Sequence, residues 1–445
     1  MSRNLFSPEA LADRAHFVRN QLPEGGLFAG QTWRIAPEPF ALGQELFEEI
    51  ESLGRVLLQF NRAVNLLYRR SVAGKQPAWI AGWLDQGKTA KILSVQRTAA
   101  LKNELPRVIR PDLLLTEDGL TLTELDSVPG GIGLAAWLNQ TYAGMGADVV
   151  GGRDGMLHGF ASIFGGAPVV HVVVSDESAT YRPEMAWACR QLNALGYCFA
   201  HRDAQPFEVA ADEAVYRFFE LFDLDHVPVA DALLEAAVRR RILLTPPPKA
   251  FFEEKMLLAL LWNDHLFDFW RQELGASFFL QLRDRVPYTW VMDPAPLPPQ
   301  AAIPELDLVD WQELKNLSQR DRELILKVSG FSPEAWGARG VYLGSDLSAA
   351  DWSAIVDKAL GGFTQTPYVL QRFTKTQMIP SVWYDFDRSQ LAAFPGRVRL
   401  CPYYFVTGEG DQARAKLGGV LATTCPADKK IIHGMSDAIL APCCV

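Results

Sequence analysis

The sequence is short of cysteine, of long apolar runs and of positive charge, and each shortage excludes a class of protein. Its six cysteines show no paired zinc spacing, and their scarcity fits a reduced cytoplasm. No run approaches the roughly 18–20 apolar residues of a membrane span, and the first residues lack the apolar segment of a secretory signal. The 43 basic residues against 52 acidic ones give a net charge of −9, which argues against nucleic acid and membrane as main partners.

What the sequence does have is the composition of a folded protein. Its 445 residues, 49% hydrophobic and 21% charged, are too many for one ordinary core and predict two or three subdomains. Residues 1–70 carry apolar side chains at helical spacing. Residues 110–127 form two alternating runs around an Asp-Gly turn, which predicts a β-hairpin. Cys443 and Cys444 are open to a redox reading, but we expect exposed, unpaired thiols at a chain end.

The middle of the chain predicts a parallel sheet. Residues 167–178 have the apolar pattern of a buried strand, residues 181–196 that of a helix ended by glycine, and residues 197–203 that of a second strand. Together they form a β-α-β unit.

The second half of the chain predicts a mixture of helix, loop and strand. Residues 253–270 have the pattern of one helix, and the proline-rich residues 293–307 that of a surface loop. Residues 324–344 predict a strand, a glycine-rich loop and a second strand. Residues 368–373 and 397–406 predict further strands.

Residues 122–134, LTELDSVPGGIGL, fit two incompatible patterns. Their glycines and Ala136 match the loose dinucleotide fingerprint G-x-G-x-x-A, which requires a preceding strand that is buried on both faces. Polar residues alternate with leucines here, and Pro129 removes a backbone donor near the place where a pyrophosphate would bind. We therefore favour the other pattern, a strand whose polar face carries Glu124 and Asp126. NAD binding is the least supported alternative.

Three carboxylates are expected close together on the predicted hairpin. Asp112 begins its first strand, and Glu124 and Asp126 lie on its second, where antiparallel pairing can bring them side by side. Clustered carboxylates repel one another unless a cation lies among them, and hard oxygen ligands suit magnesium that also binds phosphate. A solvated acidic face is the alternative, and the residues alone leave both open.

Resemblance to a known family adds to this reading. Arg110-Pro-Asp112, followed by the hairpin and by Glu124-Leu-Asp126-Ser-Val-Pro-Gly130, resembles the metal-binding hairpin of ATP-grasp ligases. D-Alanine–D-alanine ligases and glutathionylspermidine synthases have similar stretches. The family usually has asparagine where Asp126 stands. The resemblance implies ATP and Mg²⁺ as cofactors, with Asp112, Glu124 and Asp126 as the metal ligands.

The resemblance extends to a nucleotide site. Lys327 and the glycine-rich loop after it are similar to the family's lysine strand and mobile loop; a lysine offers a point charge to phosphate, and glycines let backbone amides approach closely. Residues 371–373 resemble the strand that binds adenine, and Lys255 resembles the first nucleotide lysine, with Lys249 as its competitor. The nucleotide-binding residues that this implies are Lys255, Lys327, Gly330, Gly337, Arg339, Gly340, Gln371 and Phe373.

The same resemblance implies the catalytic residues. Arg399 resembles the late arginine that contacts the transferred phosphate, and with Arg110 and Lys327 it would supply the positive charge that phosphoryl transfer needs. By analogy alone, the amides of the turn at Gly130 and Gly131 would hold a substrate carboxylate.

The order of these motifs implies the fold. In most ATP-grasp enzymes the lysines precede the metal hairpin, whereas here they follow it, as in the circularly permuted group. The expected fold is therefore α/β (α+β), a circularly permuted ATP-grasp fold with a Rossmann-like pre-ATP-grasp domain. We expect residues 1–160 to hold helices and the metal-binding part, 161–248 the pre-ATP-grasp domain, and 249–445 the nucleotide lysines and the glycine-rich lid.

The function implied is that of an ATP- and magnesium-dependent carboxylate–amine ligase. ATP phosphorylates a carboxylate, and an amine attacks the acyl phosphate to form an amide or peptide bond. The expected partners are small-molecule or peptide acids and amines. The alternatives are a kinase on the same scaffold, a nucleotide-binding protein without turnover, and the NAD reading. The sequence contains no motif that identifies the substrates or the oligomeric state.

Overall fold

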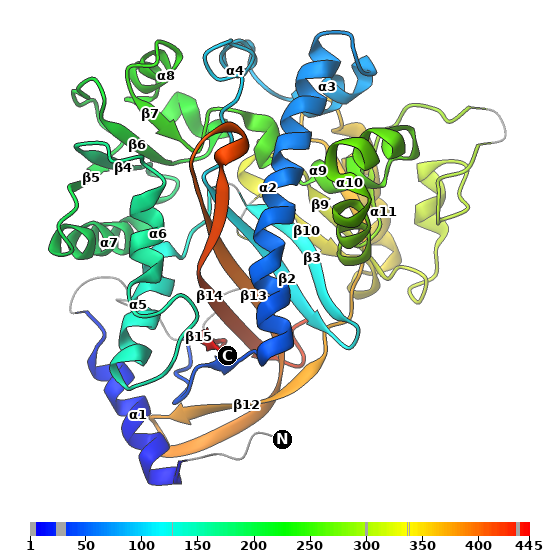
Figure 1. Cartoon of the computed structure of the whole chain (residues 1–445). Coiled ribbons are helices and arrows are strands. Elements are labelled where there is room, and N and C mark those ends of the chain that lie inside the picture. The colour runs from blue at the N-terminus through cyan, green and yellow to red at the C-terminus, as the bar shows by residue number, and fades with distance from the viewer. Residues whose placement is uncertain are drawn as a thin grey trace.

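The described residues of this computed structural model form three β-sheets with helices around and between them (Figure 1). The structure describes residues 6–23, 33–126, 128–298, 301–335, 337, 339–432 and 437–445. No described helix has the length and apolar character needed to cross a lipid bilayer. The mixed α/β architecture with several sheets is that of the predicted class.

The largest sheet combines strands from distant parts of the chain. Its order is β1-β15-β14-β13-β2-β3, and β12 pairs with β13 beyond this path. Strands β13 and β2 are antiparallel neighbours, with Leu400 opposite Leu113. The bounds of its strands are β1 Phe40–Ala41, β2 Val108–Thr116, β3 Gly119–Asp126, β12 Met378–Asp385, β13 Gln390–Thr407, β14 Arg414–Pro426 and β15 Ile439–Cys444.

Strands β2 and β3 are the predicted hairpin. They are antiparallel, with Asp112 opposite Glu124 and Arg110 opposite Asp126. Gly119 ends the turn at a φ of 115°, a conformation that favours glycine. The prediction of a hairpin with its charged residues paired across the strands is confirmed.

A second sheet contains the predicted β-α-β unit. Its strands are all parallel, in the order β5-β4-β6-β7. Strand β4 is buried along its whole length, as expected for a parallel strand between covered faces. Helix α7 connects β4 and β5. The bounds are β4 Val170–Val174, α7 Arg182–Ala194, β5 Phe199–Asp203, β6 Ala214–Phe218 and β7 Leu243–Thr245.

The third sheet is antiparallel, in the order β10-β9-β11-β8. It contains the strands predicted on either side of the glycine-rich loop, and the apolar residues of α11 pack against it. The bounds are β8 Thr289–Val291, β9 Leu324–Val328, β10 Val341–Leu343, α11 Ala349–Gly361 and β11 Tyr368–Arg372.

Helix α2 packs lengthwise on the largest sheet, in front of β13 and β14 in Figure 1. Its buried residues recur every three or four positions, so that one apolar stripe faces the core. Gly54 lets the helix approach closely, since a Cβ there would lie 2.6 Å from a ring carbon of Tyr404. Helix α2 spans Gln44–Val72. The other α-helices are α1 Pro8–Asn20, α3 Ala78–Asp85, α4 Ala90–Gln96, α5 Ile132–Gly144, α6 Gly155–Ser162, α8 Ala230–Val238, α9 Met256–Trp262 and α10 Phe267–Arg285.

Two predictions about local structure are wrong. The helix expected over residues 253–270 is divided, because α9 ends before Asn263, whose side chain accepts a hydrogen bond from the amide of His265 and starts the next turn. Cys443 and Cys444 are not exposed tail thiols: both lie in β15, where Cys443 is buried and Cys444 is partly buried. The two cysteines belong to an inner strand of the sheet, because β15 lies between β14 and β1.

Candidate active site

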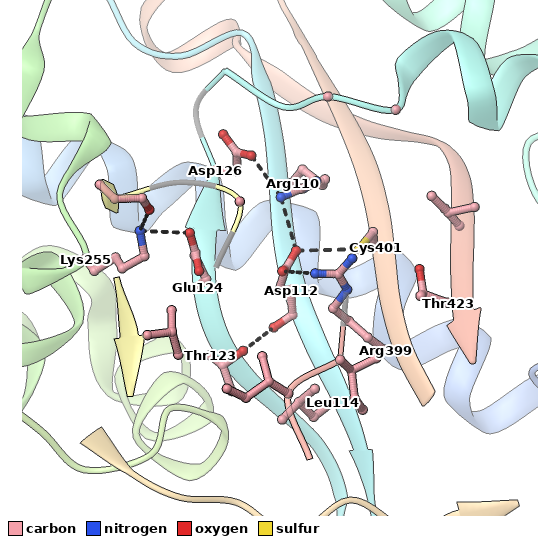
Figure 2. Close-up of a pocket in the computed structure, with 18 of the residues that line it drawn as sticks. Arg110, Asp112, Leu114, Thr123, Glu124, Asp126, Lys255, Arg399, Cys401 and Thr423 are labelled. Atoms are coloured by element: carbon pink, nitrogen blue, oxygen red, sulfur yellow. Dashed lines mark hydrogen bonds and ion pairs between the residues drawn. The ribbon is translucent and has the colours of Figure 1, made fainter. Parts of the chain in front are cut away.

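A cavity of about 450 Å³ lies where the three sheets meet. It is lined by one face of the β2–β3 hairpin, by β9 and β11, by β13 and β14, and by the segments around Gly130 and Tyr181. Figure 2 shows the charged side chains of the hairpin between Lys255 on one side and Arg399 on the other. Ten residues assigned from the sequence line this cavity: Arg110, Asp112, Glu124, Asp126, Lys255, Lys327, Gly337, Gln371, Phe373 and Arg399.

Lys327 joins the hairpin to the third sheet. Its Nζ donates hydrogen bonds to Oε1 of Gln371 at 2.9 Å and to the carbonyl of Thr123 at 3.2 Å. Only 7% of the residue is exposed. Burial lowers the pKa of Lys327 to about 8, against the opposing attraction of Glu124. The ammonium group therefore lies in a dry site with few partners of opposite charge, where a phosphate would stabilise it.

Asp112 lies between two arginines. Arg399 Nη1 is 2.8 Å from one carboxylate oxygen and Arg110 Nη2 is 3.2 Å from the other, which also accepts a 3.5 Å hydrogen bond from the thiol of Cys401 (Figure 2). Burial by itself would raise the pKa of Asp112, but the two guanidinium groups outweigh it and lower that pKa to about 2. Asp112 is therefore ionised and holds both arginines in place.

The other two carboxylates of the hairpin also face cations. Asp126 is 2.8 Å from Arg110 and accepts a hydrogen bond from the amide of Val128. Burial raises the pKa of Asp126, Arg110 opposes this shift, and the charges of Glu124 and Asp112 add to it. Glu124 is 3.1 Å from the ammonium group of Lys255. Negative charge is thus incompletely balanced at Asp126.

The three carboxylates do not converge on one point. Among the residues that the structure describes, no group of three acidic, histidine or cysteine side chains is placed to hold a metal ion. Their donor chemistry still fits magnesium, because the repulsion at Asp126 is what a divalent cation would relieve. Asp112 is already engaged on both oxygens, so Glu124 and Asp126 fit better. The assignment of these residues to a metal stays a prediction.

The geometry decides between the two candidate lysines near residue 250. Lys255 lines the cavity, and its Nζ also donates to the carbonyl of Ala335 at 2.6 Å. Lys249 is buried elsewhere, where its Nζ donates to Asn65 at 2.9 Å and to the carbonyl of Glu104 at 2.6 Å. Burial lowers the pKa of Lys249 to about 7, and its hydrogen bonds join α2 to the segment between α4 and β2. Lys255 is the lysine available to a nucleotide.

The glycine-rich loop is only partly brought to the cavity. Gly337 lines it, whereas Gly330 packs at the end of β9, where a Cβ would lie 2.5 Å from the carbonyl of Glu253. Gly340 has a similar packing role, since a Cβ there would lie 2.6 Å from the carbonyl of Glu334. Arg339 is 3.0 Å from Glu177 at the surface. Residues 336 and 338 of this loop lie outside the described residues, and the lid function stays a prediction.

Sequence reasoning missed the side chains at the opposite end of the cavity. Glu184 in α7 and Tyr181 before it line this end, with Tyr403 from β13. Tyr403 donates its hydroxyl proton to the carbonyl of Gly130 at 2.8 Å. Glu220 and Thr423 also line the cavity, and the buried hydroxyl of Thr423 has no hydrogen-bond partner among the residues that the structure describes. None of these residues belongs to a local motif, so the sequence offered no signal for them.

The start of α5 already binds a carboxylate of the protein itself. The carboxylate of Glu184 accepts a hydrogen bond from the amide of Gly133 at 2.9 Å, and the amides of Gly131 and Leu134 also bond to it. The amide of Gly133 is therefore already engaged by the protein itself, and the expectation that the turn at Gly130 and Gly131 holds a substrate carboxylate stays a prediction. The same contact argues against the dinucleotide reading, which needs these amides for a pyrophosphate.

Comparisons with known proteins bear on the fold. Neither a model of a protein family nor a curated protein sequence matches the chain. A glutathione synthetase-like effector from Globodera pallida, in its apo form, is similar over 98% of this chain and 97% of its own, with a TM-score of 0.54 and 11% identity. A putative γ-glutamylcysteine synthetase from Methylobacillus flagellatus KT is similar over 85% and 84%, with a TM-score of 0.38 and 12% identity.

The likeness to the Globodera protein shows a shared fold along nearly the whole chain. At this level of identity it shows the fold alone: the chain has a mixed α/β fold like that of the Globodera protein. The circular permutation and the Rossmann-like character of the parallel sheet stay predictions.

Proposed function

We propose that this protein is an ATP- and magnesium-dependent ligase that joins a carboxylate to an amine through an acyl phosphate. The observation that carries the proposal is the convergence of four cations, from distant segments of the chain, on one cavity: Arg110, Lys255, Lys327 and Arg399. Phosphoryl transfer between anions depends on positioned positive charge more than on acid–base groups. A cavity with this set of cations suits a triphosphate and a carboxylate together.

The nucleotide would lie against the third sheet. Gln371 and Phe373 line the cavity at the end of β11, where adenine would bind, and Lys327 on neighbouring β9 points to the hairpin. Lys255 and Lys327 would exchange their present oxygen partners for phosphate oxygens, since a charged acceptor makes a stronger hydrogen bond than a carbonyl does.

The arginines would act on the group that is transferred. Asp112 fixes Arg399 and Arg110 side by side, so that their remaining N–H groups can face the acid substrate and the phosphate moving to it. Fixed donors stabilise the developing charge without having to reorganise. The Nε atoms of both arginines are buried without a hydrogen-bond partner among the described residues, so these side chains are not fully satisfied by the protein.

Magnesium, when bound, would neutralise phosphate charge, and Glu124 and Asp126 are the residues that would hold it. Their partners Lys255 and Arg110 would then be free to contact anionic oxygens. The amine would approach from the acidic side of the cavity, where Glu220 lies near Asp126. The carboxylates of Glu253 and Asp126 act on Glu220 by like-charge repulsion, which an ammonium group would relieve.

The names of the structural neighbours, a glutathione synthetase-like effector and a putative γ-glutamylcysteine synthetase, agree with a ligase that forms amide bonds. The likeness to the Globodera protein supports the proposal only through the shared fold.

A phosphate-release screen tests the proposal. The full chain is incubated with ATP and magnesium and with pairs of acids and amines drawn from amino acids, peptides and polyamines. Release of ADP that requires both an acid and an amine supports the ligase. Release with a single alcohol indicates a kinase, and ATP binding without any turnover indicates a binding protein. Lys75→Ala, which changes an exposed lysine outside the cavity, is the matched control for Lys327→Ala, which removes a lysine of the proposed phosphate site.

A further inference from the structure

Glu184 places a carboxylate at the amino-terminal end of two helices. It lies in the first turn of α7, and it accepts hydrogen bonds from the first amides of α5, with the amide of Gly133 at 2.9 Å. Helix amino-termini carry unpaired N–H groups and a partial positive charge, and they bind anions for that reason. The anion at this position is a side chain of the protein itself.

The packing between Glu184 and the start of α5 is close. A Cβ at Gly133 would lie 2.7 Å from Cγ of Glu184 and 2.8 Å from its carbonyl oxygen. A Cβ at Gly130 would lie 2.4 Å from the ring of Tyr181, and Tyr403 is hydrogen-bonded to the same residue. The glycine at position 133 is thus needed for the carboxylate to reach the amides, and only 7% of Glu184 is exposed.

This end of α5 faces the substrate cavity. Glu184 lines the same space as Lys327 and Arg399, together with Gly130 and Gly131. An open helix terminus here would offer its amides, that of Gly133 among them, to a substrate carboxylate in the same cavity. The carboxylate of Glu184 accepts hydrogen bonds from this helix terminus instead, and it adds a negative charge to the lining of the cavity.

We propose that Glu184 is a specificity-determining residue, which fills the helix amino-terminus and excludes acid substrates that carry a second carboxylate at this end. The acid substrate then reaches the cations with one carboxylate, and the group facing α5 is neutral or cationic: an amide, a hydroxyl or an amine. The inference rests on the proposed ligase function and names its substrate class. The physical basis is repulsion between Glu184 and a second carboxylate in a site with little water. This repulsion weakens the binding of a diacid and does not affect an acid whose other end is neutral.

The first test asks whether Glu184 fills an anion site, and it needs no nucleotide. Thermal unfolding of the full chain is followed at pH 8, where Glu184 is ionised, in 100 mM sodium acetate, 100 mM acetamide and 100 mM sodium chloride. We expect acetate to raise the Tm of Glu184→Ala by about 2 °C over chloride, by binding at the vacated amides. Wild type and the control Asp231→Ala, an exposed first-turn acid of α8, should show only the smaller response that comes from the cations of the cavity, which are the same in all three proteins.

An equal acetate response in wild type, or none in Glu184→Ala, overturns the filled anion site. If Glu184→Ala does not fold, the second test decides, because Glu184→Gln keeps the size and the acceptor oxygen of the side chain. It compares the binding of glutarate and of its monoamide, glutaramate, by calorimetry. We expect wild type to prefer glutaramate by at least about tenfold, and Glu184→Gln to reduce that preference to within about threefold.

An unchanged preference in Glu184→Gln, a wild-type preference for the diacid, or no binding of either ligand to either protein overturns the proposal. Failure of the ligase function would appear separately, as absence of ATP turnover with any pair of acid and amine. The acetate response does not depend on turnover, so the two failures are distinguishable.

Discussion

The two ends of the cavity differ in whether their anion-attracting groups are available to a ligand. At the end formed by the hairpin and the third sheet, Lys327 and Lys255 contact carbonyl, amide and carboxylate oxygens that a phosphate can replace. At the end formed by α5 and α7, the amides already hold the carboxylate of Glu184. One end is prepared for an anion from solution, and the other is closed to one.

This difference between the two ends indicates that the cations alone do not determine which ligand the cavity binds. Both ends have groups that attract anions, lysines at one and a helix terminus at the other, but only the first leaves this attraction available. Variants that alter one end and not the other therefore separate nucleotide binding from substrate choice.

The largest expected effect is at the phosphate end. Lys327→Ala removes a buried cation from the proposed path of the phosphate, and we expect kcat/KM for ATP-dependent turnover to fall by roughly 10³-fold. The Tm should stay within about 2 °C of wild type, because burial disfavours the charged lysine and its loss is tolerated. Steady-state kinetics and thermal unfolding measure the two quantities, with Lys75→Ala as the control. A Tm loss that parallels the activity loss would indicate a structural lysine.

The next effect concerns the closed end and pH. Burial raises the pKa of Glu184 to about 7, with the amides opposing the shift, so the folded protein binds this proton more tightly than the unfolded chain does. The stabilisation is complete below the unfolded pKa of about 4.5 and is lost as the pH rises through 7, by at most about 3 kcal/mol. Glu184→Gln should lack this loss. Urea unfolding of both proteins between pH 5 and 8.5 measures it, and parallel curves would contradict the assignment.

A smaller effect is expected at the hairpin. Glu124→Gln keeps the shape of the side chain but removes a charge from the proposed magnesium position, and we expect a roughly 10²-fold fall in turnover that added magnesium partly restores. A magnesium titration of the phosphate-release rate measures it. Insensitivity of the variant to magnesium, with full activity, would remove Glu124 from the metal site.

The smallest effect is on nucleotide affinity. Without magnesium, the carboxylates beside the phosphate-binding lysines should repel the triphosphate, so EDTA should weaken ATP binding by about tenfold. Calorimetry with and without EDTA measures this. Glu184→Gln should show the same EDTA effect as wild type, because it alters only the other end. Equal affinity in both conditions would contradict a metal site on Glu124 and Asp126.

The sequence predicted the open end of the cavity far better than the closed one. The hairpin follows from alternating residues and an Asp-Gly turn, and Lys327 from a strand that runs into a glycine-rich loop; each signal lies within about twenty residues. The contact between Glu184 and Gly133 joins residues that are 51 positions apart, across two helices. An acid in a first turn is common in helices, so nothing local marked it.

The pairing of Asp112 with Arg399 was hidden for the same reason. The two residues lie 287 positions apart and meet only because β13 packs beside β2. The hairpin therefore looked like a cluster of unpaired carboxylates, whereas in the folded protein each carboxylate faces a cation. Whether such a carboxylate cluster can bind a metal depends on cations that come from remote strands, and the sequence of the hairpin itself does not show those cations.

The pairing of β2 with β13 also determines how the protein reaches its folded state. The intervening chain must close a loop of nearly three hundred residues before Leu113 and Leu400 can pair, and such distant contacts form late and slowly. During synthesis, the hairpin leaves the ribosome long before its neighbour strand exists, with one edge unpaired. The charged face of the hairpin gives this waiting intermediate a polar surface that resists aggregation. We therefore expect the residues proposed for catalysis to help keep the nascent chain soluble as well.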